Sequence, residues 1–166
     1  EDLDAIVSGI DDFAVSRMLA RVPHPYGRRD AESFLETSRA DAHRNIALSI
    51  HDADGLVGGL GLTGLRSERE YGYWLARPAW GKGYATEAAR AVIDYAFEEF
   101  AIGQLLAGAR VLNPASRHVL EKCGFQWTGV ELHRFLALGS STPVDRFKLE
   151  RGVWSSIKSW HNAARR

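Results

Sequence analysis

One short stretch of the chain determines the fold class that we expect: Tyr73-Trp74-Leu75-Ala76-Arg77-Pro78-Ala79-Trp80-Gly81-Lys82-Gly83-Tyr84-Ala85-Thr86-Glu87-Ala88. The aromatic run 71–76 predicts a strand, which Arg77 and Pro78 end. From Tyr84 to Phe100 apolar residues recur at the spacing of a long amphipathic helix. A strand, a turn with two glycines and a helix therefore follow one another directly, and backbone N–H groups of the turn meet the positive end of the helix dipole.

This arrangement is suited to binding a phosphate group. Gly81 and Gly83 let the backbone approach an anion closely, and Lys82 adds a positive charge. The alternative is a tight strand-to-helix turn that binds nothing, because glycine and other small residues also suit a helix start for purely structural reasons. The turn alone does not separate these two interpretations.

The rest of the chain predicts a mixed α/β layer fold in one domain. Two helical segments come first, over about 3–20 and 30–42, and a hairpin of two strands follows over 45–52 and 56–65. After the central helix we expect a strand over 104–111, a helix that Asn113 and Pro114 open and that ends before Gly124, strands over 125–138 and 144–150, and a short C-terminal helix.

Composition excludes several classes of protein. The 166 residues are 45% hydrophobic and 25% charged, as in an ordinary globular domain, and 21 basic residues balance 21 acidic ones. No overall field therefore favours nucleic acid or an anionic membrane. There is no apolar run of membrane-spanning length and no visible signal peptide. The single cysteine, Cys123, excludes an internal disulfide, so we expect a cytoplasmic protein.

Two motifs in order resemble the GCN5-related N-acetyltransferase (GNAT) superfamily. The segment 80–88 is similar to its pyrophosphate-binding motif Q/R-x-x-G-x-G/A, with Gly83 and Ala85 at the last two defined positions and Trp80 where Gln or Arg is common. The segment 113–125 resembles the N-x-x-S-x-x-x-x-E-K-x-G-F helix of the branch of ribosomal-protein N-terminal (RimJ/RimL-like) acetyltransferases. The strand 70–75 and the pairs Pro25-Tyr26 and Asp30-Ala31 are also similar to that branch.

The resemblance implies a mixed, mostly antiparallel central sheet flanked by helices, with acetyl-coenzyme A as co-substrate. It implies a cofactor site built from Trp74, Leu75, Ala76, Gly81, Lys82, Gly83, Tyr84, Ala85, Thr86, Asn113 and Ser116. The first strand of such domains is not visible in the sequence. Either it lies upstream of Glu1, so that residues 1–166 lack it, or another segment replaces it.

The resemblance also suggests two catalytic residues. Glu70 matches an acidic position before the fourth family strand, so it is the candidate base that takes the proton of the acceptor amine, directly or through water. Alternatively it is a solvated charge in the turn 67–70. Many GNAT enzymes have an acid tyrosine where this chain has Leu120, so Ser116 becomes the candidate acid for the leaving thiolate. Alternatively, Asn113 and Ser116 only cap the helix.

The expected acceptor is a primary amine, either a protein N-terminus or a small molecule. His24, Tyr26 and Glu70 are its candidate binding residues, although aromatic residues beside prolines also occur as simple loop packing. Loops 22–27, 64–70 and 139–143 would form that pocket. The alternative function, suggested by the departures at Trp80 and Leu120, is a catalytically silent acyl-coenzyme A-binding sensor or scaffold.

Four further features of the sequence bear on function. The stretch 59–64 satisfies G-x-G-x-x-G but leads into a charged turn and not a helix, so it does not predict a dinucleotide site. Residues 81–86 lack the spacing of a phosphate-binding P-loop. The histidines lack metal-ligand spacing, so we expect no metal. Trp154 and Trp160 near the C-terminus suggest a contact surface, such as that of a homodimer.

Overall fold

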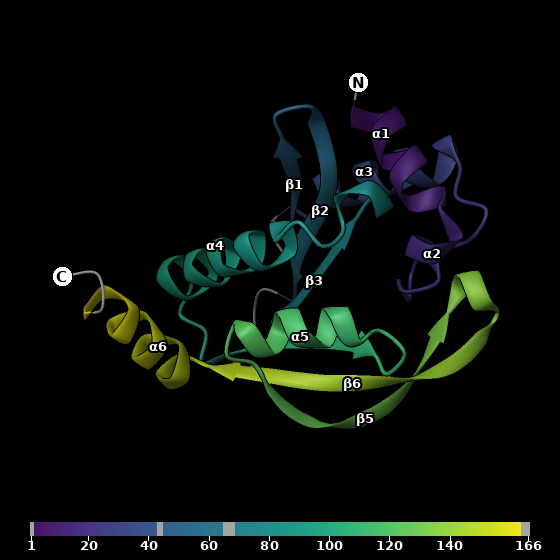
Figure 1. Ribbon diagram of the computed structural model, residues 1–166. Helices are drawn as coiled ribbons and strands as arrows, with labels where there is room; N and C mark the ends of the chain where they lie inside the picture. The colour runs from purple at the N-terminus through teal and green to yellow at the C-terminus, as the bar shows by residue number, and fades with distance from the viewer. Residues whose placement is uncertain (1, 43–44, 65–68, 164–166) are drawn as a thin grey trace.

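The computed structural model describes residues 2–42, 45–64 and 69–163. Its strands form one six-stranded sheet in the order β1-β2-β3-β4-β6-β5, with helices packed around it (Figure 1). The strands are β1 (Ile46–Asp52), β2 (Gly55–Thr63), β3 (Arg69–Leu75), β4 (Gln104–Arg110), β5 (Gln126–Phe135) and β6 (Ser140–Glu150). The helices are α1 (Asp2–Asp11), α2 (Phe13–Ser16), α3 (Arg28–Ala40), α4 (Tyr84–Glu99), α5 (Pro114–Lys122) and α6 (Arg151–Ala163), with short 3-10 turns η1 (Arg77–Ala79) and η2 (Leu136–Leu138).

Every neighbouring pair of strands is antiparallel except β3 and β4, which are parallel. The expected mixed, mostly antiparallel sheet with flanking helices is therefore confirmed. The long helix α4 is the crossover between the two parallel strands, as a parallel connection requires. Because α4 follows β3 directly, its N-terminal end lies at the end of that strand.

The parallel ladder between β3 and β4 is short. Cα partners run only from Arg69–Leu105 to Tyr71–Ala107, and beyond Tyr71 the two strands have no paired residues. Residues 72–75 of β3 pair only with β2. The sheet therefore opens at its centre, and this gap faces the start of α4 (Figure 1).

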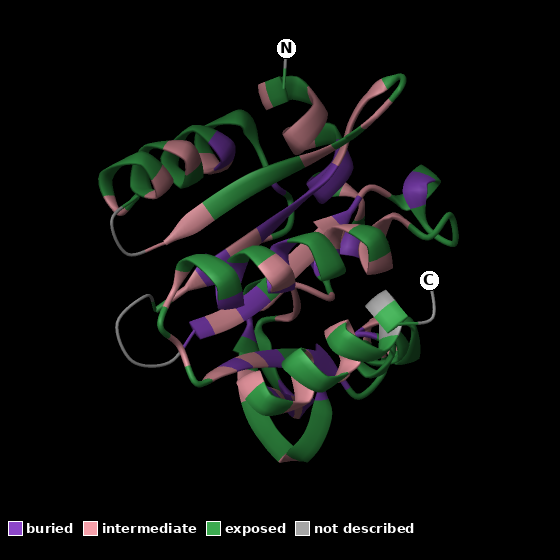
Figure 2. Cartoon of the chain, turned by 90° about the vertical axis from the view of Figure 1, so that its left-hand side faces the viewer, coloured by how far each residue is buried: buried purple, intermediate pink, exposed green. Residues whose placement is uncertain are grey.

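The main core lies between the sheet and the helices α4 and α5. Phe97, Leu105, Leu120, Phe147 and Leu149 are all at most 1% exposed there. A second, smaller cluster on the other side of the sheet joins Ile10, Tyr26 and Ala31, with Trp74 of β3 packed against it. In Figure 2 buried residues concentrate in the central strands, whereas β5, at the bottom of the view, is mostly exposed.

Two expectations need correction. Strand β6 begins at Ser140, so residues 140–143 are strand and do not form the loop that we expected for the acceptor pocket. The carbonyl of Pro143 accepts from Val111 N–H at 3.1 Å, so the imide nitrogen of Pro143 also faces the β4 side, beyond the last β4 pair at Val144. The N–H that proline lacks is therefore not needed by β5, which is why a proline is tolerated here.

The second correction concerns the two tryptophans near the C-terminus, which we expected to form a contact surface. Trp154 is not exposed: its ring stacks on Phe97 at 5.0 Å between centroids, and its indole N–H donates to Asp94 at 2.6 Å. Trp160 is 70% exposed. Of the two tryptophans expected to form a contact surface, one is thus part of the packing between α6 and α4. In the described ranges no helix combines the length and apolar character needed to cross a membrane.

Candidate active site at the centre of the sheet

The turn before α4 has the geometry of an anion cradle. Gly81 and Gly83 adopt positive φ angles of 73° and 89°, which side chains other than glycine rarely adopt. A Cβ built on either glycine would meet no heavy atom within 4 Å, so the space in front of both is open. Gly83 is the N-cap and offers no side-chain cap, and its carbonyl accepts from Thr86 N–H at 3.1 Å. The N–H groups of Tyr84 and Ala85, which precede this bond, have no intrahelical acceptor and point outward.

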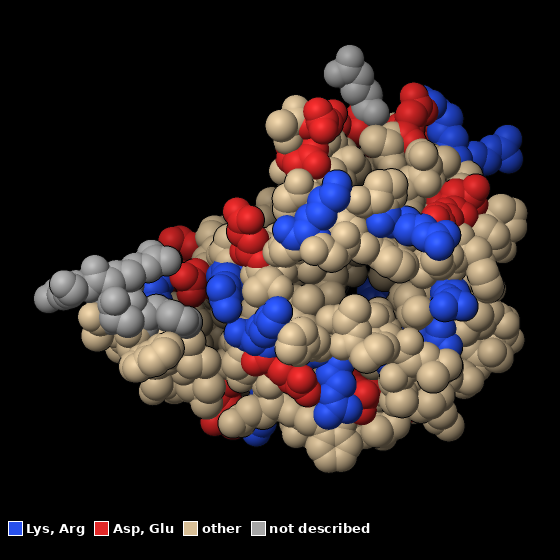
Figure 3. Space-filling model, viewed as in Figure 1, with Lys and Arg blue, Asp and Glu red and all other residues tan. Residues whose placement is uncertain are grey.

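A hollow of about 560 Å³ adjoins this turn, and it is lined by Gly83, Thr86, Glu87, Arg90 and Lys122. Figure 3 shows Lys and Arg side chains gathered around the concave region between the start of α4 and α5. Arg90 and Lys122 were not among the residues that we expected from the sequence. Residues 83, 86, 87 and 90 have the i, i+3, i+4, i+7 spacing of one helix face, so the sequence did contain a signal for Arg90. Two cations and one carboxylate, with exposed Lys82 nearby, make this a net positive site suited to phosphate groups.

The end of β3 presents backbone groups to the gap. The N–H of Ala76 donates to Val57 O of β2 at 2.9 Å, so it is already in use. Because N–H groups alternate in direction along a strand, those of Tyr73 and Leu75 point the other way, toward the gap beside β4. The carbonyl of Leu75 accepts from the indole N–H of Trp80 at 2.9 Å. Trp80, which stands where the family often has Gln or Arg, thus fixes the turn to the strand end.

Two expected cofactor residues direct their side chains elsewhere. Trp74 packs toward α1, where a Cβ on Gly9 would lie 2.8 Å from its ring. The Tyr84 hydroxyl donates to Asp52 at 3.3 Å, and burial and this carboxylate raise the pKa of the phenol. Only the backbone of Trp74 and Tyr84 is therefore available to a ligand in the gap or at the turn.

The start of α5 lies on the same side of the sheet as α4. Asn113 caps it, because its side-chain oxygen accepts from Ser116 N–H at 3.2 Å. The Ser116 side chain adjoins that of Tyr73, a residue that the sequence motifs did not mark as catalytic. Leu120 is 1% exposed and belongs to the core. The capping role of Asn113 is thus visible in the structure, and the Ser116 hydroxyl is left to face Tyr73.

Glu70 lies on the opposite face of the sheet. It belongs to β3, not to a turn, and its carboxylate accepts from Arg146 Nη1 at 2.7 Å. Side chains alternate along the strand, so Glu70 and Trp74 face α1 while Tyr71 and Tyr73 face α5. The two candidate catalytic residues therefore lie on opposite faces of the sheet, near its central gap: Glu70 on one face and Ser116 on the other. The remainder of the expected 64–70 loop, residues 65–68, lies outside the described residues.

The two acceptor candidates near the N-terminus differ in exposure, because His24 is exposed and Tyr26 is buried. The His24 ring contacts that of Phe13 in a tilted arrangement at 5.0 Å between centroids, and its Nδ1 lies 3.6 Å from an Asp11 carboxylate oxygen. Tyr26 is 5% exposed within the smaller core cluster, and burial raises the pKa of its phenol. The burial of Tyr26 agrees with loop packing, the alternative that the sequence left open, whereas His24 remains exposed.

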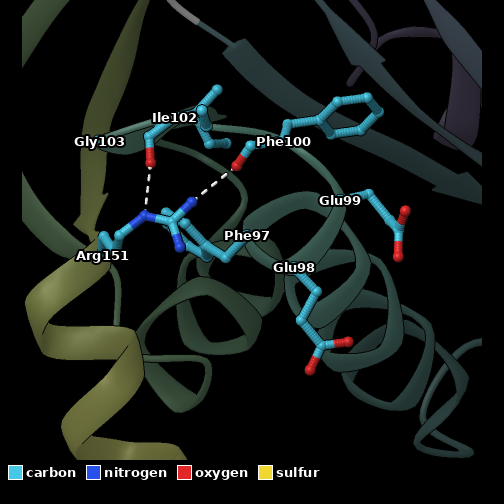
Figure 4. A pocket seen from close by; sticks show the side chains of 8 residues that line it. Phe97, Glu98, Glu99, Phe100, Ile102, Gly103 and Arg151 are labelled. Atoms are coloured by element: carbon cyan, nitrogen blue, oxygen red, sulfur yellow. Dashed lines mark hydrogen bonds between the residues drawn. The ribbon is translucent and has the colours of Figure 1, made fainter.

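A second hollow, of about 640 Å³, lies at the other end of α4 (Figure 4). Arg151 of α6 donates there to the carbonyls of Phe100 at 2.7 Å and Ile102 at 2.8 Å. These bonds fix the connection between α4 and β4 to the start of α6, so the Arg151 guanidinium has a structural role. The hollow is remote from the glycine turn. Within the described part of the chain, no group of three or more His, Cys, Asp or Glu residues could hold a metal ion.

Comparison with known proteins identifies a family that this chain matches. A family model described as an acetyltransferase (GNAT) domain matches residues 1–126. YdaF of Bacillus subtilis strain 168, whose name assigns it provisionally as a ribosomal N-acetyltransferase, is 35% identical over 141 residues, which cover 77% of this chain and 75% of YdaF. Two further curated relatives are matched over only 59% and 26% of their lengths, so the chain spans less than two thirds of each.

Solved structures show the same fold. Spermidine N-acetyltransferase from Vibrio cholerae, crystallised with CoA and spermine, superposes with a TM-score of 0.78 at 22% identity, over 92% of each chain. RimJ from Mycobacterium smegmatis, in complex with CoA-disulfide, gives a TM-score of 0.79 at 22% identity, over 91% of this chain and 78% of RimJ. At this level of identity the likeness concerns the fold.

Proposed function

The chain belongs to the GNAT acetyltransferase family, and from that premise we propose that it transfers an acetyl group from acetyl-coenzyme A to a primary amine. One observation carries the proposal: the open glycine turn before α4 lies at the central gap of the sheet, with cations beside it. The turn offers N–H groups and a helix dipole to a pyrophosphate, and Arg90 and Lys122 offer charge to further phosphate oxygens.

The gap supplies the remaining parts of the reaction. The Tyr73 and Leu75 N–H groups can bind the pantetheine arm and the thioester oxygen, because they lack a partner strand on that side. Asn113 and Ser116 border the sulfur end. Glu70, on the other face, accepts the proton that the attacking amine loses. The acceptor thus enters from the α1 side while the thiol leaves on the α5 side, in a ternary complex of direct attack.

The acceptor class follows from the relative. The name of YdaF assigns it provisionally as a ribosomal N-acetyltransferase, and on this basis we propose a protein N-terminus as the first acceptor to test, with small amines second. Tyr26 would act on the acceptor only by shaping its loop, because its side chain is buried, whereas the exposed His24 could contact the acceptor directly. We also propose that the protein forms a homodimer, which the exposed Trp160 supports, and that it is cytoplasmic, which the single cysteine supports.

Replacing Gly83 with valine tests the cofactor site. A β-branched side chain is strained at a φ of 89° and would fill the open space in front of the turn. We expect calorimetry to show no binding of coenzyme A to Gly83→Val. The matched control is Gly139→Val in the β5–β6 connection, where φ is 61° and the space is equally open. It should lose a similar stability, about 1–2 kcal/mol, and keep coenzyme A affinity.

Thiol release from acetyl-coenzyme A separates the enzyme from the silent sensor. We expect release to rise when peptides with free N-termini or small amines are added to the purified protein. Binding of coenzyme A with no amine-dependent release across the panel would favour the sensor. Undiminished binding by Gly83→Val would instead overturn the cofactor site itself.

A further inference from the structure

The reaction proposed above leaves a thiolate that must gain a proton, and the family position for a donor is occupied by buried Leu120. A serine hydroxyl alone is a poor acid, because it does not titrate in the range of ionisable side chains. A phenol is a much better proton donor than an aliphatic hydroxyl, because its reference pKa of about 10 lies within about two units of that of a thiol, about 8.5. A tyrosine at the gap is therefore the group to look for.

Tyr73 occupies that position. The β3–β4 ladder ends at Tyr71, so Tyr73 is the first side chain on the α5 face beyond the point where the strands part. Its ring stacks on that of Tyr71 at 5.8 Å between centroids, and it is half-buried against the main core. The ring is thus held by packing, and its hydroxyl end lies at α5.

Ser116 connects this hydroxyl to the sulfur end of the site. The backbone N–H of Ser116 is fixed by the Asn113 cap at 3.2 Å, and its side chain adjoins the Tyr73 side chain. Two neighbouring groups could disturb the charge of the pair, namely Tyr71 and Cys123. Burial raises the pKa of both, so both are neutral at physiological pH. Burial raises the pKa of Tyr73 and the neighbouring Ser116 hydroxyl lowers it, and the phenol is protonated at physiological pH.

We propose that Tyr73 is the acid of the reaction and that its proton reaches the thiolate sulfur through Ser116. As the carbon–sulfur bond breaks, its electron pair stays on sulfur; the Ser116 hydroxyl gives its proton to the sulfur and takes one from the Tyr73 hydroxyl. The phenolate is then reprotonated by solvent, while the proton lost by the amine leaves through the base on the opposite face. Free thiol and amide are the products, and charge balances over the cycle.

The first test is Tyr73→Phe, which keeps the ring and its stacking and removes only the hydroxyl. The value of kcat should fall on the order of 10²-fold, with unchanged acetyl-coenzyme A affinity by calorimetry. The matched control is Tyr71→Phe, two residues earlier on the same face, whose buried hydroxyl has no hydrogen-bond partner in the described chain. It should turn over close to the wild-type rate.

The second test separates proton donation from packing. With 4-nitrophenyl thioacetate, whose thiol is far more acidic, the leaving group departs without a proton, so the loss in Tyr73→Phe should largely disappear. The double variant Tyr73→Phe/Ser116→Ala should be little worse than either single variant, because both act in one relay. Equal losses with both thioesters would overturn the proposal in favour of packing, as would full activity of Tyr73→Phe. A wild-type protein that binds coenzyme A yet acetylates no amine would overturn the enzyme function itself.

Discussion

Arg146 contacts two carboxylates on the face of the sheet opposite α5. Its Nη1 lies 2.7 Å from Glu70 and its Nε 3.5 Å from Glu131, and its side chain covers Gly108 of β4, where a Cβ would clash at 2.6 Å. The glycine thus makes room for the guanidinium beside the candidate base. An ion pair orients Glu70 toward the gap, but it also competes with an incoming amine for the same oxygen.

The pair of carboxylates offers a matched test of the base. Glu70→Gln should lower kcat/KM on the order of 10²-fold at neutral pH, and the loss should shrink as pH approaches the pKa of the acceptor amine, because free amine then needs no base. Glu131→Gln removes the other contact of Arg146 and should change the rate little. pH–rate profiles of both variants decide the matter, and profiles that superimpose on each other would assign Glu70 to ion pairing alone.

The residues found from sequence are those whose role depends on local geometry. Gly83 and Asn113 each stand directly before a helix, where the local backbone requires residues of these types, so a sequence motif identifies them. Tyr73 and Lys122 act only because β3 and α5, far apart in sequence, meet across the core. Their contribution depends on which face of a strand or helix meets a neighbour, and a single sequence does not specify that pairing.

At the scale of elements, β3 connects the two halves of the proposed site. Its odd-numbered side chains from Tyr71 to Leu75 pack toward α4 and α5, and its even-numbered ones face α1 and Arg146. The strands and the helices α3 to α6 were expected from hydrophobic period and turn residues, with boundaries shifted by a few positions, whereas the expected helical segment 3–20 is divided into α1 and α2. The largest shift, the early start of β6, arises because a proline usually excludes an interior strand, and only the end of β4 makes it acceptable here.

The docking of α1 on β3 can be tested at Gly9, which lies against the ring of Trp74. A valine side chain cannot fit at a Cβ distance of 2.8 Å, so Gly9→Val must move the helix or the tryptophan. We expect a loss of about 1–3 kcal/mol in unfolding free energy and a raised KM for the amine, with coenzyme A affinity retained. Gly152→Val, at an exposed site of α6 with open space around it, is the control for introducing valine into a helix. Loss of coenzyme A binding in Gly9→Val would show that the two faces are not separable.

At the scale of the whole molecule, burial of neutral acids couples stability to alkaline pH. Burial, followed by the neighbouring Tyr73 and Cys123, raises the pKa of Tyr71 far above its usual range, and burial raises that of Cys123. The folded state therefore holds these protons more tightly than the unfolded chain. Their contribution to stability is complete below the unfolded pKa values, about 8.5 for the thiol and about 10 for the phenol, and it is lost as pH rises above them.

Tyr71→Phe isolates the phenol in this dependence. Above about pH 10 the unfolded wild-type chain loses the phenol proton that the folded state keeps, which lowers the unfolding free energy by about 1.4 kcal/mol per pH unit. Tyr71→Phe lacks this proton, so its unfolding free energy should fall with pH less steeply than that of wild type by about this amount. Near neutral pH it should be at least as stable, because it removes a buried hydroxyl that has no partner in the described chain. Phe147→Leu, a core change without a titrating group, should instead lower the whole curve in parallel. Urea unfolding from pH 7 to 11 measures all three proteins, and a Tyr71→Phe curve parallel to wild type would mean that the Tyr71 phenol ionises alike in the folded and unfolded states.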